Sequence, residues 1–165
     1  MRTIPIYETN KNKTRKKHHI PVRYLPKSLN SKDKRIQLNN LKKSRSLYKK
    51  GIYYNRPFIN SFTKKKSNHV TKAKKLYNVK NINATPELSK KTKCSITGLR
   101  KIINKGKGAF YSSGSRPNQT AFSWGIARLA SAITGGPSSK IDYDILFNEC
   151  DKDSPALKLA IKKKI

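Results

Sequence analysis

The stretch TAFSWGIARLASAITGGP, residues 120–137, is the most apolar part of the chain and predicts its central helix. Thr120 belongs to the residue types that cap helix N-termini, and two glycines followed by Pro137 are typical of a helix end. Between them, large side chains such as Trp124 are interleaved with alanines, which allow close packing against other helices. We therefore expect a helix over 121–134 at the centre of a small, mostly α domain.

Two short helices joined by one tight turn are predicted upstream. Thr85-Pro86-Glu87 provides a cap, a first-turn proline and a first-turn acid, so a helix should begin here and run to about Lys93. Ser95 is predicted to cap a second helix that ends at Asn104-Lys105-Gly106. Residues 86–104 thus have the length of a helix-turn-helix, whose second helix enters a DNA groove. Ordinary helix packing gives the same spacing and is the more frequent explanation.

Residues 105–120, KGKGAFYSSGSRPNQT, are rich in small and turn-forming residues and are predicted to form a loop. Such a loop can bind phosphate through backbone amides, or it can be a structural connector. It is not a Walker A loop, because Gly114 is followed by Ser115-Arg116-Pro117 and not by Lys and then Ser or Thr. Phe110, Tyr111 and Trp124 can stack on bases, although aromatic residues beside an apolar helix more often belong to the core.

The remainder of the chain predicts one longer helix and several short ones. The longer helix is expected over 31–50, ended by Gly51 and followed by an aromatic-rich extended segment. Ser67 and Asp142 are expected to cap short helices. The chain divides into four regions: a disordered basic arm (1–23), a basic helical and aromatic-rich extended region (24–84), a helical core with the Gly/Ser-rich loop (85–150) and a basic tail (151–165).

Charge is distributed very unevenly along the 165 residues. The chain has 39 Lys and Arg against 8 Asp and Glu, a formal net charge of +31. All of this excess lies in residues 1–141, because the final 24 residues contain five bases and five acids. A chain so basic repels itself unless anions surround it, so we expect a polyanionic partner, DNA first among them.

Clustered lysines and the basic residues around the candidate helix-turn-helix are the expected phosphate-binding groups. They are predicted to hold the nucleic-acid backbone and to read little of its sequence. The candidate nucleic-acid-binding residues are Lys42, Lys43, Lys64, Lys65, Lys66, Arg100, Lys101, Lys105, Lys107 and Arg116.

Catalysis has little support in the sequence. The acids between Asp142 and Asp153 fit no EF-hand order and are equally explained as helix caps and counter-charges, so we expect no enzyme, metal or cofactor. Cys94 and Cys150 lie far apart without Cys-x-x-Cys spacing and are expected to be reduced thiols. The chain has no apolar run of about 18 residues and no signal-peptide core, so we expect a soluble, intracellular protein without membrane insertion.

A resemblance to a known family rests on residues 105–120, on Ser123-Trp124 and on ARLASAITGG, residues 127–136, followed by Asp142-Tyr143, Ile145-Leu146 and Cys150. By these residues the chain resembles an uncharacterised basic protein family of nucleocytoplasmic large DNA viruses, over about residues 24–150. The resemblance implies a virion component, assembled in the host-cell nucleus or a cytoplasmic virus factory. It implies no catalytic residues.

Charge and resemblance together support three hypotheses. The first is a non-enzymatic virion protein that binds DNA through sequence-independent phosphate contacts. The second is a minor capsid or cement protein whose basic segments bind neighbouring capsid subunits. The third and least favoured is a metal-dependent nucleic-acid enzyme.

Overall fold

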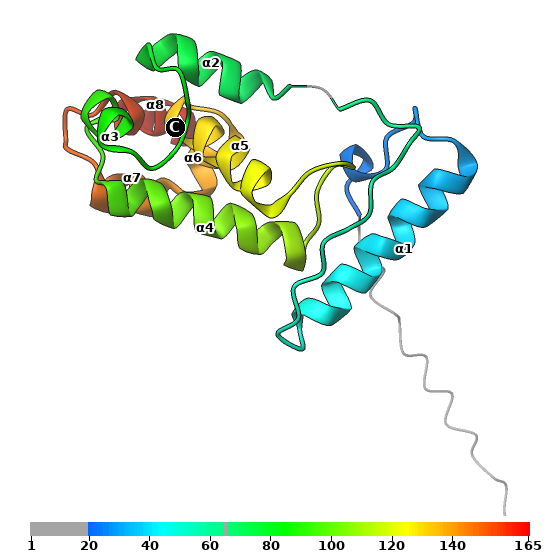
Figure 1. Ribbon diagram of the computed structural model, residues 1–165. Helices are drawn as coiled ribbons and strands as arrows, with labels where there is room; N and C mark the ends of the chain where they lie inside the picture. Colours follow the sequence, from blue (N-terminus) through cyan, green and yellow to red (C-terminus); the bar gives the residue numbers. More distant parts are fainter. Residues whose placement is uncertain (1–19, 65) are drawn as a thin grey trace, which may run out of the picture.

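The computed structural model describes residues 20–64 and 66–165. Its elements are a 3-10 helix η1 (Val22–Tyr24) and the helices α1 (Ser31–Tyr48), α2 (Asn68–Tyr77), α3 (Pro86–Thr92), α4 (Ile96–Ser112), α5 (Ala121–Ile133), α6 (Pro137–Ile141), α7 (Tyr143–Glu149) and α8 (Pro155–Lys164). The described ranges contain no β-strand, so the predicted mostly α fold is confirmed (Figure 1). The predicted basic arm falls mainly on residues 1–19, which lie outside the described residues, as does Lys65.

Helix α5 is the predicted central helix, and it contacts α2, α4, α6 and α8. Its N-terminus has a capping box, in which the Thr120 side chain accepts a hydrogen bond from Ser123 N and the Ser123 side chain accepts one from Thr120 N. Leu129 and Ile133 are fully buried in the main hydrophobic core. Because α5 has neighbours on several sides, even its alanines contribute to packing.

Helix α4 is longer than predicted and extends through Ser112, so residues 105–112 are helical and the predicted loop begins only after them. Gly106, read as a helix stop, lies inside the helix where α4 crosses α5. A Cβ atom at Gly106 would lie 2.6 Å from the Cα of Gly125, and a Cβ at Gly125 would lie 2.6 Å from the carbonyl oxygen of Ile103. The two glycines therefore allow the helix backbones to touch, which outweighs their low helix propensity.

Replacing Gly106 with alanine should destabilise the protein by roughly 1–3 kcal/mol, because the added methyl group has no room between the two backbones. Gly108 is the matched control in the same helix. Its added methyl group would meet only the Tyr48 hydroxyl, at 3.7 Å, so Gly108→Ala should stabilise the helix by up to about 1 kcal/mol. Urea-unfolding midpoints of the two variants should move in opposite directions, and a shift in the same direction would contradict the close crossing.

The C-terminal segment differs from the predicted basic tail. Residues Pro155–Lys164 form α8, whose Ala156 and Ala160 are fully buried in the same core as α5. Ser154 caps this helix by accepting a hydrogen bond from Leu157 N. The lysines at its end remain exposed, so α8 is amphipathic as expected but is part of the folded domain.

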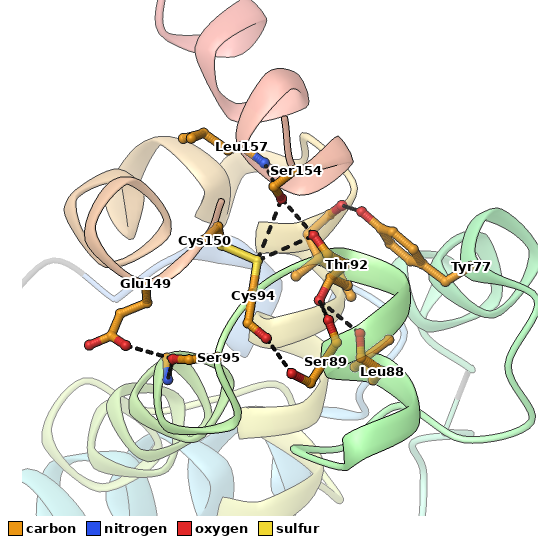
Figure 2. Close-up of a disulfide and its surroundings, with 12 residues drawn as sticks. Tyr77, Leu88, Ser89, Thr92, Cys94, Ser95, Glu149, Cys150, Ser154 and Leu157 are labelled. Atoms are coloured by element: carbon orange, nitrogen blue, oxygen red, sulfur yellow. Dashed lines mark hydrogen bonds between the residues drawn. A yellow bond between two sulfur atoms is a disulfide. The ribbon is translucent and has the colours of Figure 1, made fainter. Parts of the chain in front are cut away.

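Cys94 and Cys150 form a disulfide, which corrects the expectation of two reduced thiols (Figure 2). The two cysteines face each other in an isolated antiparallel bridge. Ser95 N donates to Glu149 O at 2.7 Å and Asp151 N donates to Lys93 O at 2.8 Å on either side of them. The two cysteines thus form a non-hydrogen-bonded antiparallel pair. In such a pair the opposing side chains lie closer together than in a hydrogen-bonded pair. The spacing of the two cysteines in the sequence does not predict that they form a disulfide.

Helix α1 lies at the opposite end of the molecule from α8 (Figure 1). Two arginines bind the end of α4, Arg45 from α1 itself and Arg56 from the extended segment that follows it. Arg56 donates to Phe110 O at 2.7 Å and to Ser115 Oγ at 2.6 Å, while Arg45 donates to Ser113 O. Both cations thus satisfy carbonyls at the negative end of the α4 dipole, and burial lowers the pKa of the Arg56 guanidinium to about 10.

Candidate nucleic-acid interface

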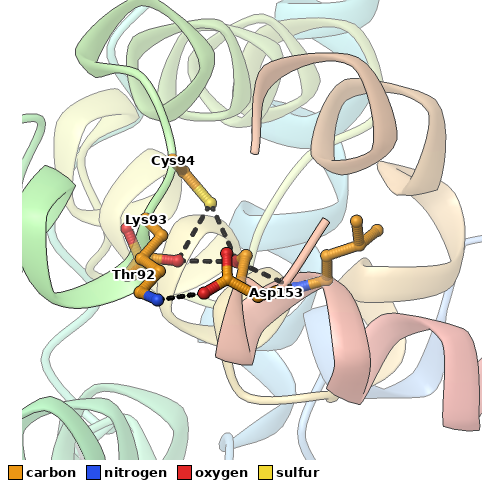
Figure 3. Close-up of polar contacts among 6 residues, drawn as sticks. Thr92, Lys93, Cys94 and Asp153 are labelled. Carbon is orange, nitrogen blue, oxygen red and sulfur yellow. Dashed lines mark hydrogen bonds and ion pairs between the residues drawn. The ribbon is translucent and has the colours of Figure 1, made fainter. Parts of the chain in front are cut away.

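The acidic residues of the C-terminal part dock onto basic residues that precede them in sequence. Asp153 pairs with Lys93 (Figure 3), and the hydrogen bond from Lys93 lowers the pKa of this exposed carboxyl group. Asp142 is fully buried and receives two hydrogen bonds from Arg128, at 2.8 and 2.7 Å. Lys105 approaches the same carboxylate at 3.2 Å. Lys93, Lys105 and Arg128 are therefore engaged by acids within the fold.

The helix-turn-helix prediction is not confirmed, because the N-terminus of α4 is occupied by a carboxylate. Glu149 accepts a hydrogen bond from Ser95 Oγ at 2.6 Å and pairs with Lys101. The bond from Lys101 and then that from Ser95 lower the pKa of Glu149. Arg100 remains exposed. A negative charge at this position repels the phosphates that a recognition helix has to approach.

The outer face of α1 carries a row of exposed cations with no acid among them. Its cations are all exposed and follow helical spacings of three, seven and eleven residues, which place them on one side of the helix. They are Lys32, Arg35, Lys42, Lys43, Lys49 and Lys50, the last two directly after the helix. The one acid of the helix, Asp33, accepts a hydrogen bond from Ser61 N at 3.0 Å, which together with the Ser61 side chain lowers its pKa. We call these six residues the α1 basic face.

The predicted binding residues are divided between several surfaces. Lys42 and Lys43 belong to the α1 basic face, and Lys64 and Lys66 lie exposed in the segment before α2. Arg100 and Lys107 of α4 and Arg116 of the following loop are also exposed. Lys101 and Lys105 pair with acids, and Lys65 is outside the described residues. Lys32 and Arg35, which belong to no lysine cluster, are missing from the predicted groups, although their helical spacing is visible in the sequence.

The aromatic candidates have different environments. Phe110 is buried, and Trp124 packs edge-on against the buried Tyr24 at 5.8 Å between ring centroids. Tyr111, by contrast, lies in a cluster with Tyr48 and the largely exposed Tyr53. The core explanation is therefore confirmed for Phe110, and the exposed ring comes from a segment for which no stacking role was predicted.

The block that carries the family resemblance mainly builds the fold. Asn118 accepts a hydrogen bond from Ile59 N at 2.7 Å and donates one to Ile59 O at 3.0 Å, which fixes the extended segment. Thr120 and Ser123 cap α5, and Arg128 pairs with a buried acid. Packing and capping thus account for these residues of the block.

Neither a metal centre nor a membrane span is found in the part of the chain that the structure describes. It holds no group of three His, Cys, Asp or Glu side chains placed to bind a metal ion. None of its helices combines the length and apolar character needed to cross a bilayer.

Comparison with known proteins gives one match. A family of unknown function, DUF5824, matches residues 21–146, about three quarters of the chain. No curated protein and no solved structure matches.

Proposed function

The chain belongs to DUF5824, a family of unknown function, and we propose that it is a non-enzymatic, virion-associated protein that binds DNA through sequence-independent phosphate contacts. The observation that carries the proposal is the α1 basic face, whose six cations are exposed and whose helix has its single acid engaged elsewhere. The virion setting rests on the resemblance to the large-DNA-virus family. Assembly would then take place in the nucleus or in a cytoplasmic virus factory.

The dimensions of α1 suit a duplex backbone. At about 1.5 Å per residue, its 18 residues span about 27 Å, which corresponds to about eight base pairs. Lysine and arginine along this length neutralise phosphates and release counterions, which favours binding without reading bases. Binding of this kind depends on the positive charges of the face and not on hydrophobic side chains.

Duplex binding should be steeply salt-dependent. If all six cations of the α1 basic face contact phosphates, log Kd should change with log salt with a slope of about 5. Replacing both Lys42 and Lys43 with glutamine should reduce that slope by about 2 and weaken binding at low salt. Fluorescence anisotropy with a labelled random duplex at several salt concentrations measures both quantities.

The matched control replaces Lys162 and Lys163 with glutamine. These lysines are equally exposed but lie on α8, at the far end of the molecule (Figure 1). This variant should retain at least most of the slope. An equal loss in the two variants would contradict a localised interface, and absence of duplex binding at low salt would refute the proposal.

A minor capsid or cement protein is the second candidate. Phe147 and Ile141 are largely exposed on α7 and α6, away from the α1 basic face, and apolar side chains of this kind suit a protein contact. The position of the protein in the virus particle distinguishes the capsid role from DNA binding. Density ordered with the icosahedral shell favours the capsid role, while recovery with the packaged genome favours DNA binding.

A further inference from the structure

Three tyrosines gather where α1 ends. Tyr48 is the last residue of α1, Tyr53 belongs to the extended segment and Tyr111 lies on α4. The ring centroid of Tyr53 lies 5.1 Å from that of Tyr111 and 6.1 Å from that of Tyr48. Tyr53 is 68% exposed, so its neighbours fix the ring while much of its surface faces solvent. An exposed ring held in place by other rings is a ready stacking surface.

An open groove of about 640 Å³ has one of these tyrosines, Tyr48, in its lining. Ser112, Asn104 and Ile145 contribute further wall. Its cationic residues are Lys101, Lys105 and Arg128.

The lysines of the groove keep exposed surface although they pair with acids. The side chains of Lys101 and Lys105 are 54% and 49% exposed. Asp142, which pairs with Lys105 and Arg128, is fully buried behind them and presents no charge to solvent. Lys101 stays beside Glu149, whose side chain is 21% exposed, so Lys105 is the lysine of the groove whose acidic partner is hidden from solvent.

We propose that this surface binds unpaired nucleotides of a single-stranded nucleic acid, with one base stacked on Tyr53 and a phosphate at Lys105. The proposal rests on the proposed nucleic-acid-binding function and specifies a second site for it. Lys49 and Lys50 immediately follow Tyr48, so the α1 basic face leads directly to the tyrosines. A strand held along α1 would thus reach the groove without a gap in positive charge.

Stacking distinguishes this site from the α1 basic face. In a duplex, the faces of each base are covered by its neighbours, whereas an unpaired base can lie on a protein ring. The tyrosine site should therefore contribute to single-strand binding and leave duplex binding to the lysines. A tyrosine ring accepts any base, so little sequence preference is expected.

The test compares Tyr53→Ala with two controls, using labelled oligothymidine, oligouridine and duplex DNA of about 20 nucleotides or base pairs. Tyr53→Ala should weaken binding to both single strands by about 10-fold and leave duplex affinity unchanged. Tyr53→Phe keeps a ring and should bind as the unmodified protein does. Phe58 is 69% exposed in the same segment but takes part in no ring pair among the described residues, so Phe58→Ala should change nothing.

The outcomes separate the two proposals. Unchanged single-strand affinity in Tyr53→Ala, or an equal loss in Phe58→Ala, overturns the tyrosine site while duplex binding by α1 stands. A loss of duplex affinity equal to the single-strand loss also overturns it. Binding of oligothymidine without oligouridine, or the reverse, identifies which of the two single strands the site accepts and supports the site. Absence of binding to all three probes at low salt refutes both proposals.

Discussion

Reducing the Cys94–Cys150 disulfide should lower the free energy of unfolding by about 4 kcal/mol. The two cysteines are 56 residues apart, and cross-linking a loop of this length removes much of the conformational freedom of the unfolded chain. For a domain of this size the loss corresponds to a fall in melting temperature on the order of 10 °C. Thermal unfolding followed by circular dichroism, with and without dithiothreitol, measures it.

The control for this experiment is the variant with both cysteines replaced by alanine. Its melting temperature should match that of the reduced protein and should not respond to dithiothreitol. Hydrogen bonds around the bridge persist in the reduced fold, because Ser95 N and Asp151 N bond to backbone carbonyls and not to sulfur. If the oxidised protein and the double variant melt at the same temperature, the cross-link does not restrict the unfolded chain as argued.

Local signals in the sequence predicted most helix starts correctly. Thr85, Ser95 and Thr120 each accept a hydrogen bond from a backbone N–H of the first turn, as their residue types indicate. Ser67 and Asp142 precede helices without making such a bond. A helix cap depends on a few neighbouring residues, so it can be predicted from the local sequence. Asp142 instead accepts a hydrogen bond from Arg128, a partner that only the tertiary fold brings close to it.

The predictions that failed all depended on distant partners. Gly106 and its neighbours have a loop-like composition, but Gly106 lies in a helix. A glycine is needed there because the backbone of Gly125, on another helix, leaves no room for a side chain. Cys94 meets Cys150 only because a backbone bridge aligns them. At the candidate interface, Lys101 was predicted from its local charge, yet its pairing with Glu149 arises from the packing of α7 against α4. The α1 basic face, by contrast, follows from spacing within one helix.

Replacing Arg128 with methionine should destabilise the protein by about 3–5 kcal/mol, because it leaves a buried carboxylate without its main partner. Asp142 has no exposed side-chain surface, while Arg128 is only 17% exposed. Lys105 is the one other cation paired with this carboxylate in the described structure, and half of its side chain is in solvent. It can compensate only part of the lost interaction.

The double replacement Arg128→Met with Asp142→Leu tests whether the loss of stability in Arg128→Met arises from the buried, unpaired Asp142 carboxylate. Removing both charged groups leaves no buried ion to solvate, so the double variant should be more stable than Arg128→Met alone, even though it lacks the ion pair. Lys101→Met is the matched control, because its partner Glu149 keeps 21% of its side chain exposed and can be solvated. That variant should lose no more than about 1 kcal/mol. Urea unfolding of the unmodified protein, Arg128→Met, Asp142→Leu and the double variant completes the cycle, and additive losses at Arg128 and Asp142 would show that the two side chains are not coupled.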